Sequence, residues 1–467
     1  MWSRYEGLTN RSAGDMTDVK LRWLTLNQSV PEITPGARRV LANTAWLSGG
    51  QVIRLATGLV VGVLVARHLG PEQFGKYSLA LALVAIASSI SSLAADSVVT
   101  REIVTDAKDK NVVLGSQFAL RALGSLLAVG AVFIVSWLQS ENSETIIVAV
   151  AAVSLLFSPF EGIATWFQAE QRPRASVLSK TVAFFVASFI RLMLVFGGAS
   201  VVAFATLFSV EAALGAAALV FAYHAYGERL WNWKVSRSWV AKLFHDSWPL
   251  LFAGVSSMLY MRLDVVMLNE MRGAHETGIY SAATRISEAW NFVPMALMAA
   301  LQPVLLRTKQ DHPALFMRRM DMLYVCTAWG SLVVAVIISI ISTPVVSVLF
   351  GKEYHESGSV LALHTWSGVA VYLGVASSQY LLAENLLKIS MFRTMLGLAT
   401  NVVLNMALIP QYGAQGAAVA TVVSYFVATF SLVIFVSTRS QAISMIRAFS
   451  PFQAVRLFRS PTSLWAQ

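Results

Sequence analysis

Four charged side chains lie inside two apolar stretches of residues 261–307, with Arg262 and Asp264 in the first stretch and Arg285 and Glu288 in the second. An ionised side chain near the centre of a membrane span costs ~2.5 kcal/mol or more, so such residues usually face a bundle interior, a partner or a wet cavity. Arginine suits phosphate, because its planar fork donates two hydrogen bonds and stays charged. The hairpin is therefore predicted to form one wall of a polar cavity inside the membrane.

The spacing of these residues indicates how they pair. Arg285 and Glu288 are three positions apart and share a helix face, so they form either a gated pair or a static intrahelical pair. Arg262 and Asp264 are two apart and face different directions, so one of them is expected to point into the bundle. Asp264 is in addition a candidate for coupling to a cation or a proton.

Other charged residues also fall within predicted spans. Arg54 is near the middle of the first span, where it is expected to line the cavity or else to form a structural ion pair with Asp264. Arg191 lies toward the outer end of the fifth span. Glu161 and Glu211, on spans four and six, are expected to be salt-bridge partners of the arginines or coupling sites.

These residues give two predicted sets. The expected substrate-binding residues of the cavity are Arg54, Arg191, Arg262 and Arg285. The expected coupling or salt-bridge residues are Asp264, Glu288, Glu161 and Glu211. No residue is assigned to catalysis or to a metal ion.

The composition sets the class of protein. Of the 467 residues, 56% are hydrophobic and 13% are charged, and the mean hydropathy is +0.62, whereas a soluble domain is about one quarter charged. The chain is therefore an integral membrane protein by composition. The net charge of +10 could suggest nucleic acid, but the Lys and Arg residues collect in loops on one side. The single cysteine, Cys326, excludes an intramolecular disulfide and a cysteine-based metal cluster.

Twelve stretches are long and apolar enough to cross the hydrocarbon, which requires about 20 residues. They cover roughly residues 41–66, 77–98, 112–138, 145–168, 177–197, 200–223, 248–269, 279–304, 321–349, 359–383, 387–409 and 414–437. Alternate loops are rich in Lys and Arg, which by the positive-inside rule predicts that both termini are cytoplasmic.

The remaining segments complete the predicted domain organisation. Residues 1–40 are polar and mixed, without the apolar core of a cleavable signal, and are expected to be a disordered cytoplasmic extension. The six-helix lobes 41–223 and 248–437 flank a basic, Trp-rich linker, 224–247, that is expected to lie on the inner leaflet. Residues 438–467 form a basic cytoplasmic tail.

The two halves share a short repeat. Gly70–Ser78 follows the first span and Gly273–Ser281 follows the seventh, and both have the pattern G-x4-G-x-Y-S at an offset of 203 residues (273 minus 70). Equivalent positions in two six-span halves predict an internal repeat related by an axis along the membrane normal.

These residues together resemble the polysaccharide transporter branch of the multidrug/oligosaccharidyl-lipid/polysaccharide (MOP) superfamily, which includes Wzx-type O-antigen flippases and lipid II flippases. Residues 47–80 carry mid-span Arg54 and a Leu-Gly-Pro turn, and residues 264–303 carry Asp264, Arg285 and two prolines. Phe350-Gly351 with Tyr354, and the segment NVVLNMALIPQYGAQGAA at 401–418, complete the resemblance over about residues 40–437.

The resemblance implies an all-α protein with twelve transmembrane helices in two six-helix halves around a central cavity. It also implies a flippase, not an enzyme, that moves an undecaprenyl-diphosphate-linked oligosaccharide from the inner to the outer leaflet by alternating access. The expected setting is the bacterial inner membrane, in surface polysaccharide biosynthesis such as that of O-antigen or exopolysaccharide. The expected partners are the lipid-linked glycan, the bilayer and, further, a polysaccharide polymerase and a chain-length regulator, with no nucleic acid.

No cofactor is expected, and coupling to H⁺, Na⁺ or the membrane potential is left open. An anion moving outward is favoured by ~2.3 kcal/mol per charge per 100 mV. One alternative is a drug or cation antiporter of the same superfamily, although buried arginines would repel a cation. A second alternative is a membrane-embedded polymerase or acyltransferase, against which the short outer loops and scattered histidines argue.

Overall fold

The computed structural model describes residues 35–93, 95–105, 110–139 and 142–458, and all of their regular structure is helical. Residues 1–51 and 52–467 form two compact units. In the first unit, helix α2 begins at Pro35, so the last residues of the predicted disordered extension, 1–40, are helical and the others lie outside the described residues. The second unit holds the other helices and most of α2.

The first half of the chain contains the helices α2 (Pro35–Ser92), α3 (Asp96–Thr105), α4 (Lys110–Gln139), α5 (Asn142–Ala152), the 3₁₀ helix η2 (Val153–Glu161), α6 (Gly162–Ala169), α7 (Pro173–Phe196) and α8 (Val201–Ala225). The second half contains α9 (Arg237–Arg272), α10 (Ala274–Ala289), α11 (Phe292–Asp311), α12 (Pro313–Phe350), α13 (Ser357–His364), α14 (Ser367–Ala383), α15 (Leu387–Phe430), α16 (Arg439–Arg447) and α17 (Pro451–Phe458). Short 3₁₀ helices at Leu230–Asn232, Lys352–Tyr354 and Ser431–Val433 join some of them.

Ten helical segments of the described chain are long and apolar enough to cross a membrane. Two of them, Ile53–Thr105 and Leu387–Val433, are each divided by a glycine outside helical geometry, Gly70 and Gly413 respectively. Because each part is a separate helix, the described chain offers twelve apolar helical segments, six in each half, which agrees with the predicted number of spans. The eighth span is further interrupted at residues 290–291, between α10 and α11, just before Pro294.

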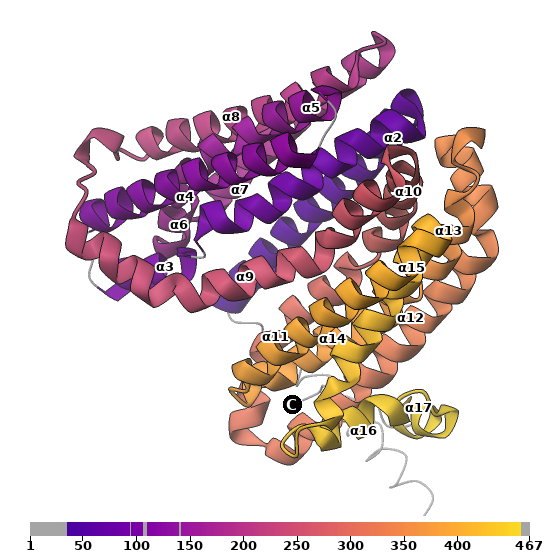
Figure 1. Cartoon of the computed structure of the whole chain (residues 1–467). Coiled ribbons are helices and arrows are strands. Elements are labelled where there is room, and N and C mark those ends of the chain that lie inside the picture. Colours follow the sequence, from indigo (N-terminus) through magenta and orange to yellow (C-terminus); the bar gives the residue numbers. More distant parts are fainter. Residues whose placement is uncertain (1–34, 94, 106–109, 140–141, 459–467) are drawn as a thin grey trace, which may run out of the picture. The chain divides into compact units, whose positions relative to one another are not determined.

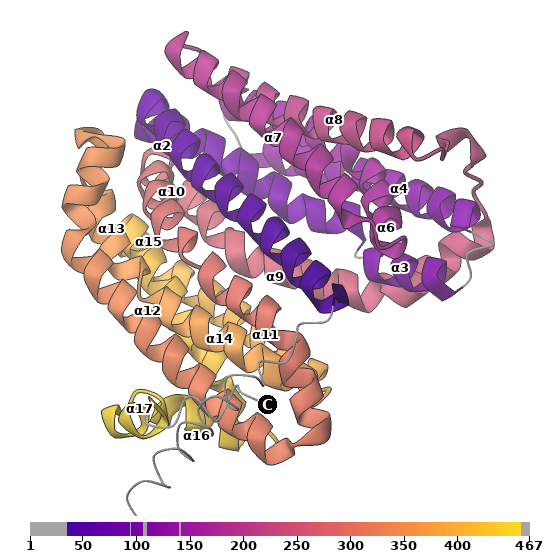
Figure 2. The same ribbon diagram turned by 180° about the vertical axis from the view of Figure 1, so that it is seen from behind.

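Each half has its own close helix pairs, and some helices join the halves. In the first half α7 packs along α8, while in the second α12 packs against α13 and α14 (Figures 1 and 2). Helix α9 contacts α4 of the first half and α15 of the second. The largest buried apolar cluster also spans both halves, since it contains Val61 and Phe74 together with Leu268 and Ile279. This places the two halves in direct contact within residues 52–467.

The two copies of the repeat pack against each other. A Cβ atom built on Gly75 would overlap the backbone of Ala274, and one built on Gly278 would overlap the backbone of Pro71. Adding 203 to residues 71 and 75 gives 274 and 278, so each copy meets the other through equivalent residues. This is the reciprocal contact of a two-fold arrangement, and small residues permit such close helix approach.

A second pair of contacts between the halves also involves two residues that are 203 positions apart, Ala66 and Asn269. The hydroxyl of Tyr354 donates a hydrogen bond to the carbonyl of Ala66 at 2.7 Å, and burial raises the pKa of this hydroxyl. The side-chain amide of Asn269 donates to Glu144 at 3.4 Å. Residue 269 is the repeat equivalent of residue 66, so the start of α5 and the 3₁₀ helix Lys352–Tyr354 contact equivalent positions on the opposite halves.

The predicted linker 224–247 is shorter in the structure than in the sequence analysis. Helix α8 continues to Ala225, and α9 begins at Arg237 and runs without a break into the seventh span. Helix geometry accommodates Pro249 inside α9. Between these helices the indole of Trp233 donates a hydrogen bond to the hydroxyl of Tyr223 at 3.0 Å, which ties the linker to the end of α8.

Candidate functional site

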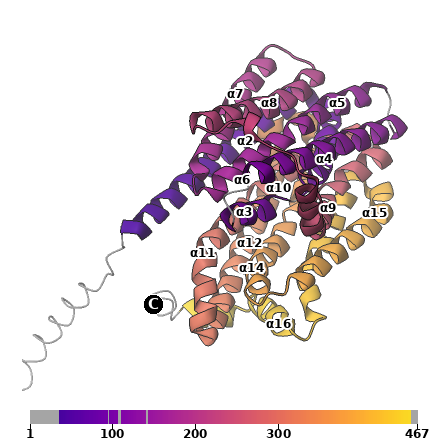
Figure 3. The same cartoon turned by 90° about the vertical axis from the view of Figure 1, so that its left-hand side faces the viewer.

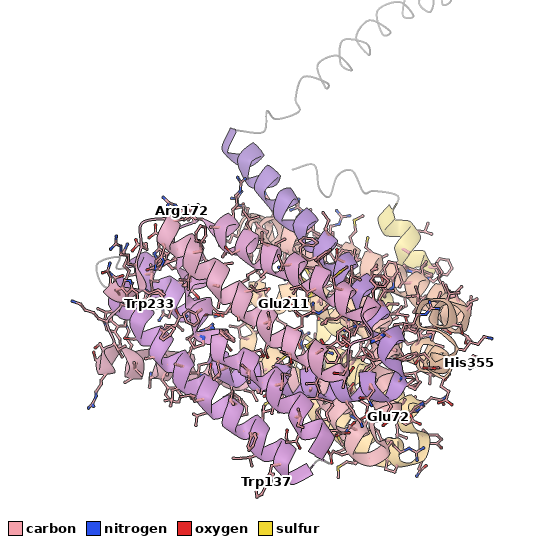
Figure 4. The ribbon with its side chains drawn as sticks, turned by 90° about the horizontal axis from the view of Figure 1, so that it is seen from above. Glu72, Trp137, Arg172, Glu211, Trp233 and His355 are labelled. Carbon is pink, nitrogen blue, oxygen red and sulfur yellow. The ribbon has the colours of Figure 1, made fainter. Side chains whose placement is uncertain are left out.

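Helices α7 and α8 hold an ion pair between Arg191 and Glu211, with 2.5 Å between Nη2 and Oε2. In the view with side chains, Glu211 lies near the middle of the picture, while Trp137 and Arg172 lie near its edges (Figure 4). Glu211 thus pairs with an arginine, which is one of the two roles expected for it, and a role in coupling stays a prediction. The carboxylate of Glu161 instead binds Lys180 on α7 and has no arginine at salt-bridge distance among the described residues.

Helices α9 and α10 hold a second ion pair, between Arg262 and Glu288 at 3.6 Å. This contradicts the predicted pairing of Glu288 with Arg285 on the same helix. The physical reason is that Arg285 is directed across to α2, where its guanidinium lies 5.4 Å from the centre of the Phe74 ring. A Cβ atom built on Gly62 would overlap that guanidinium, so Gly62 provides the space that Arg285 fills.

Arg285 brings the two ion pairs into one group. It interacts electrostatically with Tyr77, Arg191 and Arg262, and also with Glu288. Among the described residues no carboxylate oxygen lies within salt-bridge distance of Arg285. We call Arg191, Arg262 and Arg285 the arginine cluster; it joins side chains from both halves of the chain.

Arg54 occupies a different place. Its guanidinium lies 5.3 Å from the centre of the Phe184 ring on α7. The alternative ion pair between Arg54 and Asp264 is not formed, because the groups that contact Asp264 come from the second half. Arg54 therefore lies beside α7, the helix that also carries Arg191, and its predicted cavity-lining role stays a prediction.

Asp264 is buried in the second half and is fully engaged there. It accepts hydrogen bonds from the hydroxyl of Tyr280, from the hydroxyl of Thr421 at 3.4 Å and from the backbone amide of Val265 at 2.8 Å. Asp264 is only 6% exposed. Of Arg262 and Asp264, the aspartate is thus the residue that points into the bundle.

A polar network continues from Asp264 along α15. Thr421 accepts at its carbonyl from Ser424, whose hydroxyl in turn accepts from Asn401 at 3.5 Å. Asn405 donates to Asn401 at 2.9 Å, while its own carbonyl oxygen is buried and unpartnered. These side chains link spans eleven and twelve to the seventh span. A carboxylate, amide oxygens and hydroxyls are the ligand types that a hard cation prefers.

In the described part of the chain, no three His, Cys, Asp or Glu side chains lie close enough to hold a metal ion. One polar cavity of about 270 Å³ is lined by Glu276 in the first turn of α10, Glu356 before α13, and Tyr412 and Gln415 beside the kink of α15 at Gly413. An apolar groove of about 320 Å³ lies between α7 and α8. The central cavity that the family resemblance implies stays a prediction.

Some residues of the site were not singled out in the sequence. Gly62, Phe74 and Tyr77 surround Arg285, and Tyr280 holds Asp264. Phe74, Tyr77 and Tyr280 all belong to the two repeat copies, so the repeat was a signal that could have found them. Gly62 had no such signal, because its role depends on a helix from the other half of the chain.

Arg121, on α4, belongs to a separate group of polar side chains. It is buried, with its Nη2 atom 2.5 Å from Asp96 and its Nη1 atom 2.9 Å from the carbonyl of Ser158. Gln117 and Thr165 donate to the same oxygen of Asp96. These bonds make Arg121 part of a structural network within the first half.

The fold is that of MOP transporters. The structure of the lipid II flippase MurJ in an inward closed conformation matches with a TM-score of 0.68 and 14% sequence identity, over 89% of this chain and 92% of that chain. An inward-facing multidrug resistance MATE family transporter matches with a TM-score of 0.61 and 17% identity, over 85% of this chain and 96% of that one. These matches establish the architecture.

Sequence relatives and one family give the closer relationship. The probable flippase AglR of Haloferax volcanii is 23% identical over 388 residues, which is 80% of this chain and 79% of the relative. The capsular polysaccharide biosynthesis protein CapF of Staphylococcus aureus is 22% identical over 184 residues, or 39% of this chain and 46% of the relative. Residues 40–309, more than half of the chain, match the family described as "Polysaccharide biosynthesis protein". The chain is therefore a multi-pass membrane protein that belongs to the family described as "Polysaccharide biosynthesis protein".

Proposed function

We propose that this protein is a flippase that moves an undecaprenyl-diphosphate-linked oligosaccharide from the inner to the outer leaflet of the bacterial inner membrane. The observation that supports this most is Arg285. It is a largely buried cation, packed on an aromatic ring, with no carboxylate at salt-bridge distance among the described residues. A buried charge without a partner is costly, and a diphosphate is the anion that would match it.

Arg191 and Arg262 would complete the head-group site. Each is held by one carboxylate, Glu211 or Glu288, at a single contact. A guanidinium has five N–H donors, so each keeps donors free for phosphate oxygens. Arg54, beside α7, would meet the same head group at another point of its path. The descriptions of AglR as a probable flippase and of CapF as a capsular polysaccharide protein support the same substrate class.

Alternating access would carry the head group between the leaflets, with both chain termini in the cytoplasm. The membrane potential alone favours outward movement of an anion. Asp264 is the proposed group for coupling to H⁺ or Na⁺, because it is buried among hydroxyl and amide groups from three spans. A polymerase and a chain-length regulator are the proposed partners that receive the glycan.

Binding to the purified protein tests the assignment of Arg285. Arg285→Gln is expected to weaken binding of a soluble diphosphate-lipid analogue roughly tenfold to a hundredfold, because one charge-assisted hydrogen bond is worth about 1.5–3 kcal/mol. Arg272→Gln, at an exposed arginine on α9, is the control and should bind like wild type. Equal affinity in both variants, or preferential binding of a fluorescent cation by the wild type, would favour the antiporter instead.

A further inference from the structure

The C-terminal tail has a charge pattern that the transport site does not use. Residues 438–467 contain four arginines and no Asp, Glu or Lys. Two helices of this tail, α16 and α17, follow one another at one end of α12, crosswise to the spanning helices (Figures 1 and 2), and α16 is at the same end of the molecule in Figure 3. The basic charge and the position together call for a partner of negative charge.

Helix α16 is held against the second half by one face. Ala442, Met445 and Ala448 are buried there. The hydroxyl of Tyr324 donates to Gln441 at 3.0 Å, and the indole of Trp329 donates to the carbonyl of Ala448 at 3.1 Å. The helix is therefore fixed on α12 and is not a loose extension.

These contacts also set the depth of α16. Tyr324 and Trp329 lie in the first turns of the ninth predicted span, 321–349, within the segment Pro313–Phe350 that is long and apolar enough to cross the membrane. A helix attached at those turns lies at the level where the span enters the hydrocarbon. Its free face must then meet lipid head groups or the outermost part of the acyl chains.

The free faces of α16 and α17 carry exposed apolar side chains, as expected at the boundary between head groups and acyl chains. On α16, Ile446 is 56% exposed and Ile443 is exposed as well, and on α17, Phe452 is 86% exposed and Val455 is also exposed. In water this apolar area would be unfavourable, at about 25 cal/mol for each Å². An amphipathic helix with arginines beside exposed Phe and Ile is typical of segments that lie in the plane of a membrane interface.

The structure describes two arginines on this face, Arg439 and Arg447. They differ in how many of their N–H groups and how much of their charge remain available to bind an anion. Arg439 is exposed, and its Nε atom donates to the carbonyl of Val433 at 3.2 Å, which leaves the terminal nitrogens free of that bond. Arg447 is exposed and interacts electrostatically with Asp321 on α12. The face therefore keeps a positive excess that is centred on Arg439.

We propose that α16 and α17 form an interfacial anchor that binds the head groups of anionic phospholipids in the leaflet at this end of the helices. The apolar side chains insert at the boundary between head groups and acyl chains, and the arginines bind phosphate groups there. Each basic residue near an anionic surface contributes about 1 kcal/mol, which corresponds to roughly a fivefold preference for anionic lipid. This anchor does not depend on the transported substrate.

The full-length protein permits a direct test, because Cys326 is its single cysteine. In a Cys326→Ser background, a spin label is attached at Phe452→Cys, or at His355→Cys as an exposed reference in a different loop. The proteins are reconstituted in vesicles of phosphatidylcholine, with or without phosphatidylglycerol. The label at 452 is expected to be accessible to oxygen and shielded from a water-soluble relaxant, while the label at 355 is accessible to the relaxant.

Lipid selectivity is measured in the same vesicles with spin-labelled phosphatidylglycerol and phosphatidylcholine. Arg439→Gln is expected to reduce the preference for phosphatidylglycerol by up to about fivefold, and Arg272→Gln, at an exposed position on α9, is expected to leave it unchanged. The proposal is overturned if the label at 452 is as water-accessible as that at 355. It is equally overturned if the label is shielded from both water and lipid, as a protein partner or second copy would shield it, or if Arg439→Gln leaves the selectivity unchanged.

Discussion

Arg285 shows how a single side chain joins the two halves of the molecule. Glu288, three residues further along the same helix, pairs with Arg262. The guanidinium of Arg285 instead contacts Phe74 and Gly62 on α2. The sequence could indicate that Arg285 is buried, because it lies in an apolar run. It could not indicate the partner, since helical spacing reports only contacts within one helix, whereas the contact with Phe74 comes from tertiary packing.

Gly62 is predicted to be essential for the position of Arg285, and Gly58, one helical turn away, provides the control. A methyl group at Gly62 would overlap the Arg285 guanidinium, whereas one at Gly58 would be 3.7 Å from Phe184, an ordinary contact. Gly62→Ala is therefore expected to displace Arg285 and to reduce glycan export about tenfold or more, given that overpacking costs about 1–3 kcal/mol. Gly58→Ala should retain export. Export is measured by surface glycan staining in cells lacking their own flippase, at matched protein levels.

The partner of Glu288 can be established by double-mutant cycles. Glu288 pairs with Arg262 and not with Arg285, so the cycle of Glu288→Gln with Arg262→Gln is expected to give a coupling energy of about 0.5–3 kcal/mol in thermal unfolding. The cycle of Glu288→Gln with Arg285→Gln should give a smaller value. A larger coupling in the second cycle would restore the intrahelical pair that the spacing suggested.

Helices and turns could be predicted more fully than side-chain pairs. Hydropathy predicts all twelve spans, because the length of the hydrocarbon region fixes the length of an apolar helix. It could not predict the continuation of α9 from Arg237 through the basic linker, or the folding of α16, because both depend on contacts with other helices. The break at residues 290–291 also lacks a signal beyond the nearby Pro294.

The turns at Gly70 and Gly273 are predicted to require glycine for stability. Gly70 and Gly273 have φ values of 70° and 86° with ψ near 180°, a conformation that is essentially restricted to glycine and costs other residues about 1–3 kcal/mol. Gly70→Ala and Gly273→Ala are each expected to lower thermal stability by that order. Gly215, inside α8, has no neighbour within 4 Å of an added Cβ, so Gly215→Ala should be neutral or stabilising. Unfolding of the purified protein in detergent measures all three, and an equal loss for Gly215→Ala would contradict the turn argument.

At the scale of the whole molecule, the repeat predicted the relation between the two halves. Residues that are 203 positions apart make reciprocal contacts in the structure: Gly75 lies against Ala274, and Gly278 lies against Pro71. The sequence could not indicate that the two copies touch, because a repeat gives equivalence and not proximity. The proposed alternating access requires that such contacts between the halves open during each transport cycle.

A cross-link between the halves tests that requirement. In a Cys326→Ser background, cysteines at Glu144 and Asn269, which are hydrogen-bonded across the halves, would be joined by a short bis-maleimide. The cross-link is expected to stop transport, whereas a mono-maleimide should not. The reference pair is Lys110 on α4 with Glu228 in the linker directly after α8, an ion pair at 2.6 Å that does not join the two halves, and its cross-linking should leave transport intact. Full transport with the halves linked would argue against their separation.

The central claim is that the protein moves a glycan-bearing lipid diphosphate across the bilayer with the help of Arg285. The most direct measurement is transbilayer movement of a fluorescent undecaprenyl-diphosphate oligosaccharide in proteoliposomes, followed by the access of a membrane-impermeant quencher. We predict rapid movement with the wild-type protein and with Arg272→Gln, and loss of movement with Arg285→Gln. Absence of movement with the wild type, or unchanged movement with Arg285→Gln, would contradict the account.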